Sequence, residues 1–162
     1  MKTEWKILHI TLIVGVPAFF LGPVIWSPSP DIQPTQAQMP FLIVLSAVEA
    51  LAFGFGIAFI FYGRRLVKRL AGGAGKAAGA MHGSLAWILV SWWPHDNLHI
   101  HNALNINGLI VIEYLFHFTV IVAGLVIAYS FFALFKPATE GIETAETCVA
   151  DEPDCHPSFA RP

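Results

Sequence analysis

The sequence is poor in charge: only 12% of its 162 residues are Asp, Glu, Lys or Arg, and cysteine occurs only twice. Globular domains carry about 25% charged residues. A short chain that is 56% hydrophobic has more apolar surface than one small core can bury. The shortage of charge excludes a soluble enzyme, and the shortage of cysteine excludes a secreted disulfide scaffold. We therefore expect a protein whose solvent is the lipid bilayer.

The sequence also has no internal repeat, no G-x-x-x-x-G-K-[ST] phosphate loop and no nucleophile elbow. With a net charge of −2, it has no basic patch of the kind that binds nucleic acid. Nucleotide-dependent catalysis therefore has no support in the sequence, and nucleic acid is not an expected partner.

Four apolar runs dominate the chain, and an α-helix needs roughly 20 residues to cross a bilayer. Spans are predicted at about residues 5–26, 40–62, 77–93 and 108–135. The first run is too long for a signal peptide and no A-x-A site follows it, so a retained helix is expected. Pro94 is expected to end the third span, which makes residues 95–107 a polar loop. The predicted fold is an all-α, integral-membrane four-helix bundle over residues 1–137, followed by an acidic tail over residues 138–162.

The basic residues decide the predicted orientation, because membrane insertion keeps Lys and Arg on the cytoplasmic side. With the N-terminus inside, all nine basic residues fall in the cytoplasm and the two outer loops have none. Both termini, and the tail with Cys148 and Cys155, are then cytoplasmic. The loop over residues 95–107 faces the outside, and the bacterial inner membrane is the expected location.

The predicted outer loop is dense in side chains that bind metals. His95, Asp96, His99 and His101 fall within seven residues, and imidazole and carboxylate are common ligands of Cu, Fe and Zn. His99 and His101 project to the same side if the backbone is extended. We predict a transition-metal site here. The competing interpretation is that these histidines only cap helix ends.

Three more ionisable residues are predicted to lie within the membrane. Glu113 and His117 share a face of the fourth span because they are four residues apart. Glu49 lies in the second span at a similar depth. Since lipid does not tolerate such groups, they must face protein or water. We predict Glu113 and His117 as metal ligands in a layer below His99 and His101, and Glu49 as a supporting or proton-relay residue. The alternative is a set of hydrogen bonds that lock the bundle.

The face that carries Glu113 and His117 continues at helical spacing through two small residues, Gly124 and Ala128. Small residues allow membrane helices to approach closely. The fourth helix is therefore predicted to bury this stripe against a neighbour.

Two weaker candidate sites lie near the other side of the membrane. His9 and His82 could ligate a haem axially if their helices were neighbours, although simple interfacial histidines are the preferred interpretation. In the tail, Cys148, Cys155 and His156 fit no standard zinc spacing. A solvated tail is expected there.

A small four-helix chain with a histidine-rich outer edge is similar in outline to subunits of respiratory, photosynthetic or copper-dependent monooxygenase complexes, although no motif matches residue by residue. This resemblance implies a subunit of a redox or monooxygenase-like assembly, involved in electron transport and binding a metal rather than carrying the whole reaction. The alternatives are a structural or assembly subunit without a cofactor, and a small metal or proton permease. Lipid and other membrane subunits, or further copies of the chain, are the expected partners.

The orientation leads to a labelling prediction. A membrane-impermeant thiol reagent added to intact cells should reach a cysteine placed at Gln36 or Asn105 and should spare Cys148, because only the outer loops are exposed to it. Mass spectrometry of the labelled protein gives the result. Labelling of Cys148 in intact cells would contradict the orientation.

Overall fold

The computed structural model describes residues 3–31, 33–70, 75–103 and 105–134. The predictions for Cys148, Cys155 and His156 lie outside these ranges. The described chain forms four helices: α1 (Thr3–Ile25), α2 (Met39–Leu70), α3 (Gly75–Asn102) and α4 (Ile106–Leu134). No strand occurs among the described residues. The prediction of an all-α protein with four helices is confirmed.

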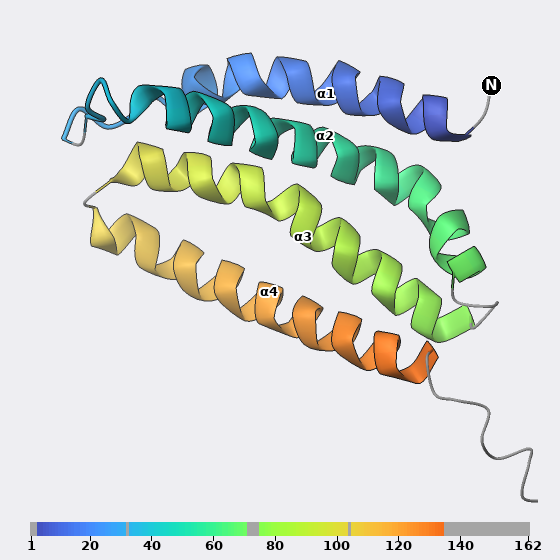
Figure 1. The fold of residues 1–162 in the computed structure, drawn as a ribbon. Coiled ribbons are helices and arrows are strands. Elements are labelled where there is room, and N and C mark those ends of the chain that lie inside the picture. The colour runs from blue at the N-terminus through green and yellow to red at the C-terminus, as the bar shows by residue number, and fades with distance from the viewer. Residues whose placement is uncertain (1–2, 32, 71–74, 104, 135–162) are drawn as a thin grey trace, which may run out of the picture.

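The helices lie side by side in one row, in the order of the sequence (Figure 1). Each helix packs mainly against its neighbours in the chain: α1 against α2, α2 against α3, and α3 against α4. Consecutive helices run in opposite directions, so α1 ends, α2 begins, α3 ends and α4 begins at one end of the row, which we call the histidine end. The helices α1 and α4 form the two edges of the row.

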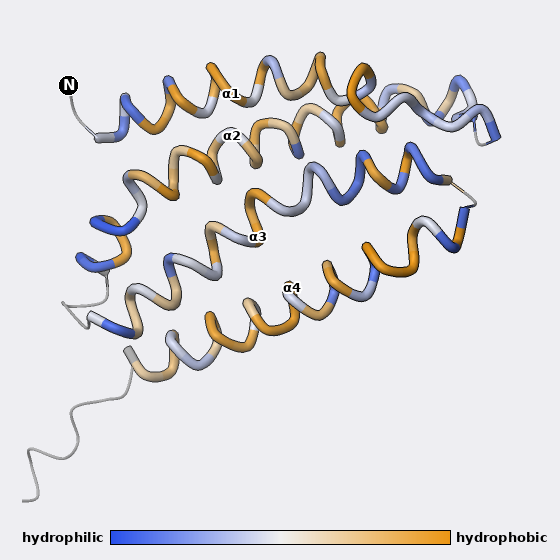
Figure 2. Tube along the Cα trace, turned by 180° about the vertical axis from the view of Figure 1, so that it is seen from behind, coloured by the Kyte–Doolittle hydropathy of each residue, from blue (hydrophilic) through white to orange (hydrophobic). Residues whose placement is uncertain are grey.

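Three of the helices are long and apolar enough to cross a membrane: Thr3–Ile25, Met39–Arg69 and Ile106–Ala133. The helix α3 is not among them, and polar residues occupy its last turns (Figure 2). It nevertheless lies between α2 and α4, which both have that length and hydropathy. The crossing of the membrane by α3 stays a prediction.

The described basic residues gather at the end of the row opposite the histidine end. They lie in the first turns of α1, the last turns of α2 and the start of α3: Lys6, Arg64, Arg65, Lys68, Arg69 and Lys76. This separation agrees with the charge distribution on which the predicted orientation rests. The compartment that each end faces stays a prediction.

The expected loop over residues 95–107 is wrong, because α3 continues through Pro94 to Asn102. Proline removes one backbone donor, but a helix packed between neighbours tolerates that loss when other groups satisfy the freed carbonyls. The carbonyl that Pro94 leaves without a donor is that of Val90, and the packing of α2 and α4 against α3 holds the helix in spite of this loss. The helix ends at Asn102, and the next residue, Ala103, has a φ of 45°, the left-handed conformation typical of the position after a helix.

The predicted buried stripe of α4 is also wrong, because the helix is rotated relative to that prediction. Phe116, Ala123 and Ser130, spaced seven residues apart, are buried. Gly124 and Ala128 are exposed. Since α4 is an edge helix that packs against α3, a single narrow seam is buried and the remaining surface is left to lipid or to a partner.

Close helix packing occurs instead between α1 and α2. A Cβ added at Gly54 would lie 2.7 Å from the backbone nitrogen of Gly15 and would also strike the carbonyl oxygen of Thr11. Both obstacles are backbone atoms, which cannot move aside as a flexible side chain can. The crossing of α1 and α2 therefore depends on glycine at these two positions.

This crossing leads to a stability prediction with a matched control. Gly54→Leu should lower the free energy of unfolding by about 1–3 kcal/mol, because the added side chain forces α1 and α2 apart. Gly124→Leu should have no such effect, since a Cβ at Gly124 meets no atom within 4 Å. Equilibrium unfolding in mixed micelles, followed by circular dichroism, measures both variants. Equal stability of the two would contradict the packing described here.

Candidate metal centre

The continuation of α3 as a helix brings together residues that a loop would have separated. His95 and His99 lie one turn apart on the face of α3 that meets α4. Glu113 and His117 lie one turn apart on α4, and Glu113 is about 10 Å along that helix from Ile106. The two helices run antiparallel (Figure 1), and the ion-pair distances show that the four side chains meet.

The carboxylate of Glu113 lies at the centre of this group. Its Oε1 contacts Nε2 of His99 and lies 3.4 Å from Nε2 of His95. Its Oε2 lies 3.1 Å from Nδ1 of His117, which donates a hydrogen bond of 2.9 Å to the backbone carbonyl of Glu113. One carboxylate therefore joins three imidazoles from two helices.

The two histidines of α3 also meet each other directly. Nε2 of His95 lies 3.2 Å from Nε2 of His99. Two ring nitrogens at this distance attract each other only when a proton or another cation lies on one of them, since two lone pairs repel. The arrangement thus concentrates electron-pair donors at one point.

His95, Glu113 and His117 form a group that could hold a metal ion, because one ligand atom from each lies within 4.8 Å of the others. His99 adds a fourth donor at the edge of this group, through its contacts with His95 and Glu113. Imidazole and carboxylate together suit Zn, Cu and Fe. The donor set therefore fits a transition metal.

His95 is the most firmly held ligand candidate. It is only 7% exposed, and its ring stacks on that of Phe116 with 3.6 Å between centroids and 15° between planes. Its Nδ1 lies 3.2 Å from Oδ1 of Asp96. A proton on Nδ1 that is donated to Asp96 leaves the lone pair of Nε2 facing Glu113. Carboxylates commonly orient metal-binding histidines in this way.

A second carboxyl group supports Asp96 from the neighbouring helix. Glu49 of α2 is 7% exposed, and its carboxyl group lies near that of Asp96. Its Oε1 has no hydrogen-bond partner within the part of the chain that the structure describes. Polar contacts thus continue from α2 through Asp96 and His95 to Glu113 on α4.

His101 does not join this group. Its Nδ1 donates a hydrogen bond of 2.8 Å to the carbonyl of Ser27, which follows α1. In a helix, residues two positions apart point to nearly opposite sides, so His99 faces α4 and His101 faces the segment after α1. The predicted pairing of His99 with His101 in an outer layer is wrong, because that pairing required an extended backbone.

The structure does not bring His9 and His82 together as a haem pair. His9 donates a hydrogen bond of 2.6 Å to the carbonyl of Trp5 in its own helix. His82 lies 2.9 Å from the carbonyl of Phe59 in α2 and donates to it. Since α2 lies between α1 and α3 (Figure 1), the two imidazoles sit on helices that are not adjacent.

Phe116 is the site residue that the sequence analysis missed. It carries no ligand atom, so only its contact with the His95 ring reveals its role. The sequence spacing could have revealed the ligand candidates themselves. His95 and His99 are four residues apart, as are Glu113 and His117, so each pair shares one face of a helix.

Comparisons with known proteins do not identify this site, so its chemistry is inferred from the side chains themselves. No known protein family, curated protein or solved structure matches the chain.

Proposed function

We propose that this chain is a membrane subunit that holds a transition-metal ion, Cu, Fe or Zn, between α3 and α4. His95, Glu113 and His117 are the central ligands, His99 is a further ligand, and Asp96 and Glu49 orient His95. The contact of one carboxylate with three imidazoles carries the proposal. We place the histidine end on the outer side of the membrane and α3 across it, as the charge distribution favours.

The accessibility of the site favours a redox or monooxygenase-like complex as its setting. The side chains of His99 and His117 are 41% and 59% exposed, whereas that of His95 is 8% exposed. A metal ion bound here would have one buried ligand, His95, and would remain accessible on the side of His99 and His117. An open side is the feature that separates reactive metal sites from purely structural ones.

The structural-subunit alternative uses the same contacts as hydrogen bonds that hold α3 to α4. It accounts for the burial of His95 and, with a proton on one imidazole nitrogen, for the contact of His95 with His99. It gives no reason for the two largely exposed imidazoles, His99 and His117, to meet the same carboxylate. The permease alternative needs an enclosed path, and a single row of helices encloses one only through association of several copies.

Metal binding tests the proposal directly. Titrations of the chelator-treated full chain in nanodiscs with Cu²⁺, Fe²⁺ and Zn²⁺, followed by calorimetry and elemental analysis, should show one high-affinity site for at least one ion. His95→Ala and Glu113→Gln should each weaken binding by about 100-fold or more, because each removes a ligand. Asp96→Asn should weaken it by about 10–100-fold, because the carboxylate only orients His95.

His101→Ala is the matched control, since it removes an imidazole from the same end of α3 without touching the group. It should leave the affinity unchanged. Circular dichroism checks that every variant remains helical. An unloaded wild-type protein, or equal affinity in all variants, would contradict the proposal and leave the structural subunit as the better interpretation.

A further inference from the structure

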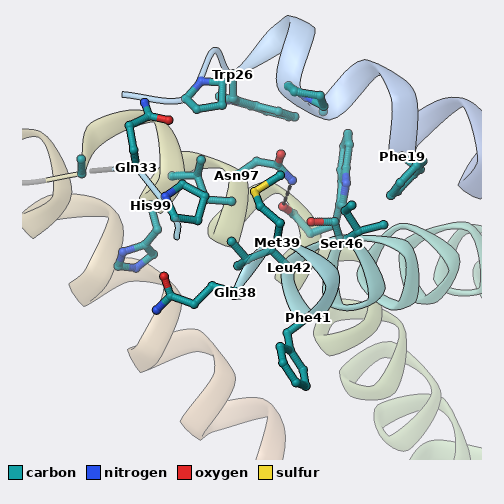
Figure 3. A pocket seen from close by; sticks show the side chains of 18 of the residues that line it. Phe19, Trp26, Gln33, Gln38, Met39, Phe41, Leu42, Ser46, Asn97 and His99 are labelled. Atoms are coloured by element: carbon teal, nitrogen blue, oxygen red, sulfur yellow. Dashed lines mark hydrogen bonds between the residues drawn. The ribbon is translucent and has the colours of Figure 1, made fainter. Parts of the chain in front are cut away.

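A cavity of about 870 Å³ lies beside the metal-ligand group, and His99, which faces α4, also borders this cavity. It is bounded by the last turns of α1 and α3, the first turns of α2 and the segment that joins α1 to α2 (Figure 3). Sites for small organic molecules typically enclose about 300–1,000 Å³. The volume is therefore that of an organic ligand rather than of a few water molecules.

The cavity is amphipathic along its length. Gln33, Gln38 and His99 gather at one end, while Phe19 lies at the other and Phe41 and Leu42 border the space between (Figure 3). Gln33 donates through Nε2 to the carbonyl of Ser29, which leaves its Oε1 to accept. This arrangement suits a molecule with a polar head and an apolar tail.

The polar end carries hydrogen-bonding groups without formal charge. Among the described residues that line the cavity there is no Lys, Arg, Asp or Glu, and His99 is the one titratable residue. The amide oxygen Oε1 of Gln38 accepts hydrogen bonds from the nitrogen and hydroxyl of Thr35, so the NH₂ group of this amide remains to donate. A phosphate head would find no cation here, whereas a carbonyl or hydroxyl oxygen would find donors and acceptors.

Aromatic rings form a rigid wall along the cavity. The rings of Trp26 and Trp93 meet edge to face with centroids 5.1 Å apart. Phe53 stacks on Trp93 at 4.7 Å and fixes its position. Such a wall binds flat rings and alkyl chains with little loss of side-chain freedom.

We propose that this cavity binds a neutral, membrane-soluble amphiphile whose head carries hydrogen-bonding oxygens, the chemistry shared by quinones and long-chain alcohols. The head lies at Gln33, Gln38 and His99, and the tail lies along the aromatic wall toward Phe19. Because His99 contacts both His95 and Glu113, the bound head is adjacent to the metal ligands. That this molecule reacts at the metal ion rests on the proposed function, whereas its binding in the cavity does not depend on a metal.

Photolabelling of the metal-free full chain in nanodiscs tests the binding separately from the metal site. The probe is an alkyl benzoquinone with a diazirine on its tail, and mass spectrometry locates the attached label. The label should concentrate on residues that line the cavity. Ser46→Phe fills the cavity from α2 and should reduce this labelling by about tenfold or more. Val44→Phe is the matched control, since Val44 is 64% exposed and lies outside the cavity.

Competition identifies the head group. Excess decylbenzoquinone or dodecanol should displace the probe, and the better competitor of the two tells which class the cavity prefers. Dodecyl phosphate should compete poorly, because the lining offers no cation. Labelling that spreads evenly over the lipid-facing surface and persists in Ser46→Phe would overturn the proposal, as would equal competition by dodecyl phosphate.

Discussion

An ionisable side chain among membrane helices needs a partner, because lipid offers neither charge nor hydrogen bonds. In this chain three imidazoles share one carboxylate as a neighbour: Glu113 reaches His95 and His99 on α3 and His117 on its own helix. The edge helix α4 packs mainly against α3. The register of α4 therefore depends on this group, together with the hydrogen bond of 3.2 Å from Trp87 to Thr119.

The same requirement explains the character of α3. This helix is not among those apolar enough to span a membrane. Its polar last turns lie between α2 and α4, with Glu49 near Asp96 on one side and Glu113 near His95 on the other. These polar contacts let a helix with low hydropathy lie inside an apolar row. The same contacts bring the electron-pair donors of His95, Glu113 and His117 together at the proposed metal site.

The sequence was sufficient for the number of helices, the separation of charge and the identity of the ionisable residues near the site. It was insufficient where local signals and tertiary packing disagree. Pro94 predicts a helix end, but packing on both sides of α3 outweighs the lost donor. The small residues Gly124 and Ala128 suggest a packing seam, but the seam follows Phe116 and Ala123. The rotation of a helix depends on which helices pack against it, and the spacing of residues along one segment does not reveal those neighbours.

The central claim is that His95 ligates a metal ion within this group. The most direct measurement is X-ray absorption fine structure at the copper edge for the full chain loaded with Cu²⁺ in nanodiscs, since it reports the atoms around the ion itself. The account predicts scattering from more than one imidazole together with oxygen, with the imidazole signal reduced in His95→Ala and unchanged in His101→Ala. A spectrum with oxygen neighbours only, or one that His95→Ala leaves unaltered, would contradict it.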